Sequence, residues 1–449
     1  MKPLRIAFAS HAYPYLEGTH AGQFVHELAS TLVDLGHEVH AVVPAPAHES
    51  ADVMDGVELA FYRAQDRVSY GRADNRYVRR PKVAVARSLG RAVLKLRQVV
   101  GKHDIDVIHA HWAIPMGFAA ALVKRAMGTP LVITTHGRDV YVDPEAGAIV
   151  PTLWYVRPFL GFALGQADGV IAVSRDCRRY AVEAGAPPER VRVIQNGVDT
   201  RRFSPQGVDP IEIRRQLGVP QRARLILFVG SLTPYKGADT LLRAMPSVLE
   251  TEPSAVAVIV GDGPEREPLT DLRDELGLGG SAVFVGSVPN SELATYANGC
   301  DVFVLPSRRE SFGIAAVEAM ACGRPVVGTR VGGLKEIIDD GETGLLVEPD
   351  RPEELAGAIL RLLGDRSYAR HLGNNARREA EAAFDGLAVS VVDFDSELAA
   401  LAAALRPRTR RIGASLGDRA CLALAERLSR DSASAVYTAE RAWRRVTWP

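Results

Sequence analysis

The segment 306–318 holds the densest group of side chains that could do chemistry. It reads Pro-Ser-Arg-Arg-Glu-Ser-Phe-Gly-Ile-Ala-Ala-Val-Glu and follows an apolar run, 301–305, that predicts a buried strand. We expect a short loop and then a helix that begins near Ser311. The first N–H groups of a helix have no partner within it, so they form a natural seat for phosphate. Gly313 would let a ligand approach this backbone closely.

Two carboxylates flank this predicted helix start. Glu318 lies along the helix, where a carboxylate could accept hydrogen bonds from both hydroxyls of a ribose. Glu310 comes just before the helix. A plainer interpretation is also open, in which Glu310 caps the helix and Glu318 is an ordinary solvated residue. Neighbouring motifs favour the binding interpretation.

Two further loops follow predicted strands of the same half. Lys236 comes after the strand predicted at 224–230 and offers a point charge to a diphosphate. The strand predicted at 255–261 runs into Gly-Asp-Gly-Pro, a turn that we expect to expose backbone donors. This turn is not the G-x-G-x-x-G fingerprint of dehydrogenases, and the chain has no P-loop. The candidate donor-binding residues in these two loops are Gly230, Ser231, Lys236, Gly261 and Gly263.

Short apolar runs rich in Val and Ile alternate with helical stretches along most of the chain. This alternation is typical of parallel sheets that are covered on both faces by helices. In the first half strands are predicted at 4–9, 37–43, 106–111, 130–136, 169–174 and 191–195. In the second half they are predicted at 224–230, 255–261, 281–285, 301–305, 325–328 and 344–347.

A turn-rich stretch after residue 203 separates the two series of strands. We therefore predict two Rossmann-like, doubly wound α/β domains at 1–205 and 206–385, whose ligands bind at the carboxyl ends of the strands. A closing helix at 386–405 is expected to return to the first domain. Residues 406–449 would form a basic amphipathic extension.

Together these motifs resemble the family 4 glycosyltransferases over about residues 4 to 400. The resemblance rests on the pair Glu310-x7-Glu318 and on several short motifs, each of which would be weak alone. They are Lys236-Gly237, Gly261-Asp262-Gly263, Gly332-Gly333-x2-Glu336, Asp340-Gly341-Glu342-Thr343-Gly344-Leu345, Thr135-His136-Gly137-Arg138-Asp139 and Asn196-Gly197-Val198-Asp199.

The resemblance implies the GT-B architecture, in which two Rossmann-like domains face each other across a cleft. It implies sugar transfer from a nucleotide-diphosphate sugar, with retention of anomeric configuration and without a bound metal or other cofactor. Lys236 would neutralise the diphosphate, Glu318 would hold the ribose, and Glu310 would bind sugar hydroxyls. His136 would reach the sugar near the anomeric centre, and the backbone N–H groups of Phe312, Gly313 and Ile314 would add donors.

The sequence departs from the family pattern at two places. The family usually has Arg five positions before the lysine, where this chain has Ser231. Arg308, Arg309 or Arg330 could supply the missing charge. Many members carry a Gly-Gly pair near the start of the first helix, where this chain reads Gly-Thr-His-Ala-Gly up to Gly22. We still expect that loop, through Gly22, to approach the donor phosphates.

Other signals point mostly to structural roles. His109 and His111 share one face of a predicted strand, but no accompanying set of ligands has zincin-like spacing, so we predict no metal site. The DxD patterns at 104–106 and 393–395 are interpreted as structural.

The four cysteines are widely separated, which fits a reducing compartment, and no apolar run could span a bilayer. We therefore expect a cytoplasmic enzyme.

Charge is unevenly distributed along a chain whose formal net charge is zero. Aromatic residues make up only 6%, and no basic run is interleaved with stacking aromatics, so nucleic acid is not an expected partner. A basic row on the predicted helix near 85–100 and an arginine- and tryptophan-rich end could instead meet an anionic membrane surface. The alternatives are a solvated helix face and a tail that packs on its own domain. These positions are Arg87, Arg91, Lys95, Arg441, Trp443, Arg444, Arg445 and Trp448.

The sequence therefore predicts a retaining hexosyltransferase that acts on a glycan or lipid-linked acceptor, in surface polysaccharide or glycoconjugate biosynthesis. Two alternatives share the architecture. One is a nucleotide-sugar 2-epimerase, which would lack the Glu310-x7-Glu318 pair. The other is a binding-only pseudo-transferase, which is suggested by Ser231.

Overall fold

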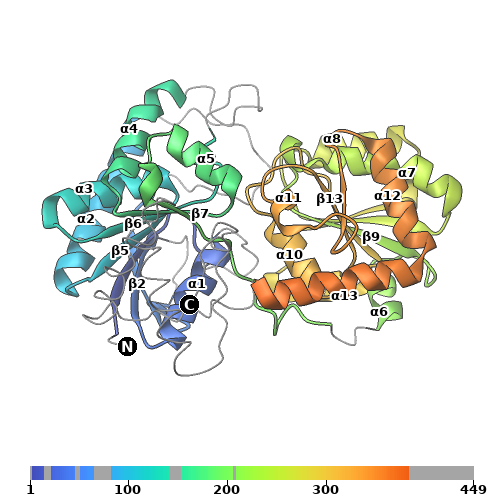
Figure 1. Ribbon diagram of the computed structural model, residues 1–449, viewed down its shortest axis with the longest axis horizontal. Coiled ribbons are helices and arrows are strands. Elements are labelled where there is room, and N and C mark those ends of the chain that lie inside the picture. Colours follow the sequence, from blue (N-terminus) through green and yellow to red (C-terminus); the bar gives the residue numbers. More distant parts are fainter. Residues whose placement is uncertain are drawn as a thin grey trace, which may run out of the picture. The chain divides into compact units, whose positions relative to one another are not determined.

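The structure is a computed structural model that describes residues 3–14, 22–45, 51–64, 82–141, 153–205 and 209–383. Its described part contains two largely parallel sheets with helices on both faces, which appear from blue to green and from yellow-green to orange in Figure 1. All strands of the first sheet lie before residue 194, and all strands of the second lie between 224 and 347. This arrangement fits the predicted division near residue 205, although the exact domain limits stay a prediction.

The first sheet has eight strands in the order β3-β4-β2-β1-β5-β6-β7-β8, and only the β3–β4 pair is antiparallel. Helix α1 (Gln23–Asp34) packs Val25 and Ala29 on one face. Helices α2 (Lys82–Lys102), α3 (Phe118–Met127) and α4 (Leu153–Gln166) contribute to the core on the other face, and α5 (Arg175–Glu183) follows β7. The strands are β1 (Arg5–Ala9), β2 (Glu38–Pro44), β3 (Val53–Met54), β4 (Val57–Tyr62), β5 (Val107–His111), β6 (Leu131–Thr135), β7 (Gly169–Ala172) and β8 (Val191–Val193).

The second sheet is entirely parallel, with six strands in the order β11-β10-β9-β12-β13-β14. Its strands are β9 (Arg224–Val229), β10 (Ala255–Val260), β11 (Ala282–Gly286), β12 (Val302–Leu305), β13 (Val326–Thr329) and β14 (Leu345–Val347). Every residue of β10 and β12 is buried. This confirms the prediction from their continuous Val/Ile/Leu runs, which are typical of strands covered on both faces.

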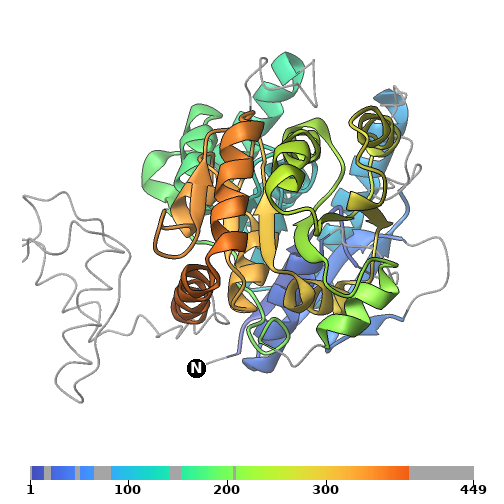
Figure 2. The same cartoon turned by 90° about the vertical axis from the view of Figure 1, so that its right-hand side faces the viewer.

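Two groups of helices accompany this sheet. In the first group α7 (Ala238–Thr251) contacts both α8 (Arg266–Glu275) and α12 (Pro352–Gly364). In the second group α10 (Ile314–Ala321) contacts α9 (Asn290–Gly299) and α13 (Arg366–Ala383), while α6 (Pro210–Gln216) contacts α9. Figure 2 shows α12 and α13 in orange to brown beside the strands. The short helix α11 (Leu334–Ile337) follows β13.

The twelve predicted strands are all present, and their ends differ from the predictions by a few residues at most. Strands β3 and β4 were not predicted. β3 has only two residues and lies at the edge of the sheet, and in β4 the charged Glu58 interrupts the apolar residues, two of which are only partly buried.

Three further predictions concern helices. Helix α10 begins at Ile314 and not near Ser311, because Gly313 adopts a left-handed conformation and closes the loop there. On α1 the predicted stripe Phe24, Leu28 and Leu32 is only partly buried, and the deepest residues include Val25 and Ala29. The predicted closing helix at 386–405 and the extension 406–449 lie outside the described residues.

No described helix is both long enough and apolar enough to cross a bilayer. The three cysteines of the described part are free thiols and are buried, so they fill core positions as small apolar residues do.

Candidate functional site

The loop that follows β12 is held between two other loops of the second sheet. Gly237, after β9, has a φ of 70°, and a Cβ there would lie 2.0 Å from the carbonyl oxygen of Pro306. Gly332, after β13, has a φ of 43°, and a Cβ there would lie 1.8 Å from the carbonyl oxygen of Glu310. Only glycine suits such backbone angles at such close approach. The loop from Pro306 to Glu310 is therefore fixed at the carboxyl edge of the sheet.

Lys236 and Glu310 meet at this edge. Lys236 Nζ lies 2.6 Å from Glu310 Oε2, and the hydroxyl of Ser307 donates to the same oxygen over 3.3 Å. The side chains of the lysine and the glutamate are only 20% and 10% exposed. The sequence predicted separate roles for these two residues, so their direct ion pair is new. It holds the ammonium and the carboxylate in place before any ligand is present.

The start of helix α10 lies next to this pair. Gly313 accepts from Ala316 N–H as the helix begins, and the N–H groups of Gly313 and Ile314 come before any intrahelical acceptor could reach them. Phe312 is buried beneath the loop. The predicted group Phe312, Gly313 and Ile314 therefore forms the positive end of a helix dipole beside Lys236 and Glu310.

Glu318 occupies the fifth position of α10, closer to the helix start than predicted. Burial and, to a lesser extent, the negative charge of Glu27 raise the pKa of its carboxyl group to about 8, and Arg202 opposes this shift. The group therefore holds a proton at neutral pH in this structure. A ribose that donates two hydroxyl hydrogen bonds would favour the ionised form instead.

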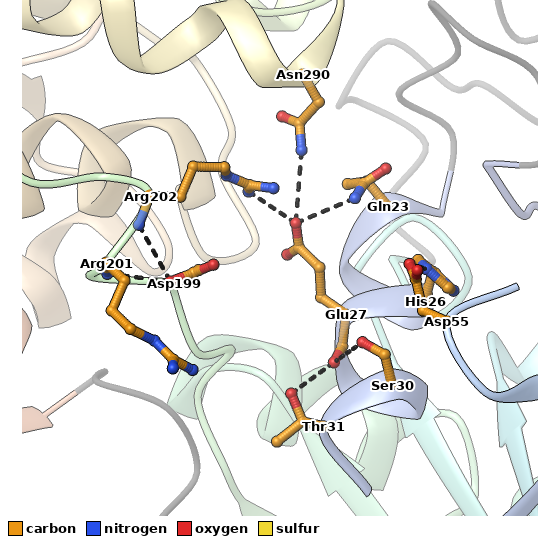
Figure 3. Close-up of polar contacts among 10 residues, drawn as sticks. All are labelled: Gln23, His26, Glu27, Ser30, Thr31, Asp55, Asp199, Arg201, Arg202 and Asn290. Atoms are coloured by element: carbon orange, nitrogen blue, oxygen red, sulfur yellow. Dashed lines mark hydrogen bonds and ion pairs between the residues drawn. The ribbon is translucent and has the colours of Figure 1, made fainter. Parts of the chain in front are cut away.

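A polar network that the sequence did not predict surrounds Glu27, a residue of α1 in the first half (Figure 3). Arg202 donates to Glu27 Oε1 over 2.7 Å, and Gln23 donates to it over 3.2 Å. Asn290, the first residue of α9 in the second half, lies 3.4 Å from the same oxygen. No motif marks these residues, because they come together only when the two halves are folded. The network joins the first half to the surroundings of Glu318.

The glycine turns after β9 and β10 lie where predicted, but their N–H groups are occupied. Gly230 N–H donates to the carbonyl of Val260, and Gly261 N–H donates to the carbonyl of Gly286. Gly263 N–H donates to the side chain of Asp262 over 2.7 Å. The expectation that this turn exposes backbone donors is therefore wrong for Gly261 and Gly263. These glycines serve close backbone packing, because a Cβ at Gly261 would lie 1.9 Å from the carbonyl oxygen of Gly230 and one at Gly263 would lie 2.3 Å from that of Leu232.

Two of the three arginines considered as substitutes at the exposed Ser231 form ion pairs with carboxylates elsewhere. Arg308 is bound to Asp239 and Asp350, with closest distances of 2.7 Å and 2.6 Å. Arg330 is bound to two other carboxylates, those of Asp340 and Glu348. The guanidinium of Arg309 lies over the Tyr141 ring.

Arg138 is the cation that sequence reasoning overlooked, although it lies inside the Thr-His-Gly-Arg-Asp motif. Its guanidinium carbon lies 5.4 Å from the centre of the Tyr235 ring, and Tyr235 directly precedes Lys236. Arg138 is exposed and belongs to the first half of the chain. A residue of that half thus contributes positive charge next to the lysine loop.

His136 belongs to a cluster of histidines at the carboxyl edge of the first sheet. Its Nε2 lies 3.1 Å from Nδ1 of His111, and its ring packs against Phe24 and Trp112. Burial is the main cause that lowers the pKa of His136 to about 3. The imidazole is therefore neutral at physiological pH, so it can form hydrogen bonds but carries no positive charge.

The neighbouring histidines share this character. Burial lowers the pKa of His11 and of His109 to about 4, and it lowers the pKa of His111 well below its usual value. The rings of His109 and His111 lie 4.4 Å apart, which confirms that they share one face of β5. The Nε2 atom of His111 is buried and has no hydrogen-bond partner among the residues that the structure describes.

Asp139 and Gly22 are the two other first-half residues of the candidate site. Asp139 accepts from the N–H groups of Ala113 and His136, over 2.7 Å and 3.0 Å, and so fixes the loop that carries His136. Burial raises the pKa of Asp139 to about 6. Gly22 immediately precedes α1, whereas the loop before it, 15–21, lies outside the described residues.

The first DxD pattern plays a structural role, as predicted. Asp106 accepts from the backbone and the guanidinium of Arg5, and Asp104 lies 3.5 Å from the same guanidinium. Both aspartates precede β5 and so lie at the opposite edge of the sheet from His136. The pattern at 393–395 lies outside the described residues.

Two family models match the chain, one in each half. The model described as "Glycosyltransferase Family 4" matches residues 21–202, and the model "Glycosyl transferases group 1" matches residues 209–379. The first range includes the histidine cluster and Glu27. The second includes Lys236, Glu310 and Glu318.

Curated relatives agree with the family models. The chain is 31% identical over 362 residues to an uncharacterized glycosyltransferase of Methanocaldococcus jannaschii, which covers 78% of this chain and 87% of the relative. It is 32% identical over 297 residues to a GDP-mannose-dependent alpha-(1-6)-phosphatidylinositol monomannoside mannosyltransferase of Mycolicibacterium smegmatis, which covers 64% of this chain and 74% of the relative.

Among solved structures, a sucrose-phosphate synthase from Thermosynechococcus elongatus matches with a TM-score of 0.73 and 27% identity, over 85% of this chain and 95% of that one. This similarity and the two parallel-sheet halves identify the fold as GT-B. With its motifs, family models and relatives all in agreement, the chain belongs to the family 4 glycosyltransferases and is an enzyme of that class.

Proposed function

We propose that this glycosyltransferase moves a sugar, with retention of configuration, from a nucleotide-diphosphate sugar to a glycan or lipid-linked acceptor. The observation that carries the proposal is the Lys236–Glu310 ion pair beside the start of α10. It places a cation, a carboxylate and a helix N-terminus at one point of the carboxyl edge, where α/β sheets bind ligands. The GDP-mannose-dependent relative supports a nucleotide-sugar donor.

The role proposed for this site is to stabilise the leaving group by positive charge. A departing nucleoside diphosphate gains negative charge in the transition state, so fixed positive groups stabilise the transition state more than the ground state. Lys236 and the dipole of α10 would supply that charge. When a diphosphate takes the ammonium as its partner, the Glu310 carboxylate becomes available to the sugar hydroxyls.

The first half would act on the sugar itself. His136 is neutral, so it would offer a hydrogen bond near the anomeric centre without adding charge. Glu318 would bind the ribose and lose its proton as it does so. Leaving-group stabilisation by Lys236, Arg138 and the helix dipole is the basis for proposing that catalysis needs neither a metal nor a cofactor.

The proposed acceptor rests on a relative, and the proposed membrane contact rests on basic residues of α2. The mycobacterial relative acts on a phosphatidylinositol monomannoside, which supports a lipid-linked or glycan acceptor and a role in surface polysaccharide or glycoconjugate biosynthesis. A peripheral position on an anionic membrane would suit such an acceptor. Arg87 is exposed on α2 and would take part in that contact.

The test is a screen of UDP-, GDP- and ADP-sugars with the full-length enzyme, using mass spectrometry to detect slow hydrolysis without acceptor. A transferase should release the nucleoside diphosphate from at least one donor. A 2-epimerase would isomerise the sugar, and a pseudo-transferase would bind a donor without turnover. Either of these two results would overturn the proposal.

A further inference from the structure

A cluster of histidine and carboxylate side chains lies at the amino end of the first sheet, at the opposite edge from His136. Glu38 and His40 are two residues apart on β2, so their side chains point to the same face. Glu58 of β4 is paired directly with His40 in the sheet register. His103 follows the last turn of α2, which packs on this face. Four side chains from three elements therefore meet.

Both ring nitrogens of His40 contact carboxylates. Nδ1 lies 3.0 Å from Glu58 Oε2, and Nε2 lies 2.6 Å from Glu38 Oε1. The His40 side chain is only 3% exposed. The ring of His103 lies 3.9 Å from that of His40, centre to centre. Each of Glu38, His40 and His103 offers a ligand atom, and these atoms all lie within 4.8 Å of one another.

A cavity of about 360 Å³ adjoins the cluster and gives it access to solvent. His40, His103 and Glu58 line this cavity, together with the carboxylate of Asp52 and the amines of Lys95 and Lys102. The cluster and the cavity wall thus bring together three carboxylates, those of Glu38, Glu58 and Asp52, and two ammonium groups.

We propose that Glu38, His40 and His103 bind a divalent transition metal ion of the zinc class, with Glu58 as the outer partner of His40. Two imidazole nitrogens and one carboxylate oxygen form a common zinc ligand set, which leaves a fourth position for water. Metal-binding histidines usually donate their other N–H to a carboxylate, which fixes the ring and its tautomer. The contact between Glu58 and Nδ1 provides that arrangement and leaves Nε2 for the metal.

The side chains must rearrange to reach this geometry, and the ring of His103 must move away from that of His40, whose centre is now 3.9 Å away. Zinc holds nitrogen and oxygen ligands at about 2.0–2.2 Å, so tetrahedral ligand atoms lie roughly 3.3–3.6 Å apart. The present contact of 2.6 Å between Glu38 and His40 is shorter than that, so Glu38 must move outward by about 1 Å. Its side chain is 51% exposed and can do so. The ion would join strand β2 to the end of α2, at the edge of the sheet opposite His136.

The test is isothermal titration of ZnCl₂ into full-length protein that has been treated with EDTA and desalted, with MgCl₂ as the comparison. We expect one zinc ion per chain, no comparable magnesium binding, and a higher melting temperature with zinc. His103→Ala and Glu38→Gln should abolish stoichiometric binding. Glu58→Gln should weaken it by about 10- to 100-fold, the usual effect of losing an outer partner.

His371→Ala is the matched control, because His371 is an exposed histidine of α13 and should leave zinc binding unchanged. The variants at 38 and 103 change solvent-accessible groups, so they avoid the folding risk of replacing the buried His40. No stoichiometric zinc binding by the wild type would overturn the proposal. Zinc binding that survives in His103→Ala at wild-type affinity would also overturn it.

Discussion

The two halves of the enzyme present opposite electrostatic characters at the carboxyl edges of their sheets. In the second half Lys236 and Glu310 are charged, paired at 2.6 Å and held by glycine loops. In the first half His136 and His111 are neutral imidazoles packed among aromatic rings. One half therefore suits a diphosphate, and the other suits a sugar that must be bound without added charge.

This difference shows how similar topology can serve two tasks. The ends of parallel strands place loops at one edge in both halves, but the residues that fill those loops decide what can bind. Fixed charge stabilises a leaving group only where that charge is already in place. Substitutions in the charged half and in the neutral half should therefore have different effects.

The largest effect is expected at Lys236. Lys236→Ala should lower kcat/KM for the donor by roughly 10²-fold or more, because a preorganised electrostatic donor is lost. Lys124→Ala is a matched control, since the Lys124 side chain is also 20% exposed and pairs closely with a carboxylate, that of Asp168. Steady-state kinetics would measure both variants. Equal losses in the two would remove the special role of Lys236.

His136 tests the neutral half. His136→Ala should lower kcat/KM by about 10- to 100-fold through loss of a hydrogen bond to the reacting sugar. Because burial places the pKa of His136 near 3, the wild-type rate should not fall between pH 8 and pH 5 through protonation of this residue. An acid limb in that range that disappears in His136→Ala would show that the imidazole titrates there and would contradict its neutral role.

A smaller effect is expected at Arg138, the first-half residue whose positive charge lies next to the loop of Lys236. Arg138→Ala should raise KM for the donor about tenfold, the scale of one hydrogen bond to a charged group. Ser231→Arg in the Arg138→Ala background should recover part of the loss, because it restores a cation at the family position. If Arg138→Ala binds the donor as well as the wild type does, Arg138 plays no part in the charge of the site.

The last expected effect concerns stability, not catalysis, and lies at Glu318. Its folded-state pKa of about 8 lies above the ordinary 4.5, so the folded state holds the proton more tightly than the unfolded state does. The wild type should therefore lose stability as pH rises from about 4.5 to 8, whereas Glu318→Gln should not. The difference in melting temperature between the two should grow with pH and level off above about 8.

Glu267→Gln, at an exposed position of α8, controls for the change from glutamate to glutamine. A pH-independent difference between wild type and Glu318→Gln would show that the Glu318 carboxyl is not protonated in the folded protein. Nucleoside diphosphate should abolish the pH trend, because the ribose hydroxyls favour the ionised carboxylate.

The sequence predicts those features that depend on local pattern. Buried parallel strands leave continuous apolar runs, so β10 and β12 are found within one or two residues. The left-handed Gly313 shifts the start of α10 from Ser311 to Ile314, and pattern alone does not reveal that backbone angle. β4 was missed because the charged Glu58 interrupts its apolar residues, two of which are only partly buried.

Site residues could be predicted from the sequence only where they belong to a recognisable motif. Lys236, Glu310 and Glu318 lie in motifs, but the motifs do not show that the first two form an ion pair. Glu27 and Arg202 are 175 residues apart in sequence and share no motif. The cluster around His40 joins β2, β4 and the end of α2, and the strand that supplies Glu58 was itself not predicted. Such contacts arise from topology, which spacing along the chain does not encode.

Amide hydrogen exchange with and without nucleoside diphosphate tests the central claim most directly. UDP, GDP and ADP would each be added at saturating concentration to the wild type and to Lys236→Ala. The account predicts that at least one of them protects the segments 230–237 and 310–318 in the wild type, with much weaker protection in Lys236→Ala. Protection confined to the histidine cluster around 109–111 and 136, or unchanged protection in Lys236→Ala, would contradict the claim that the charged half holds the donor.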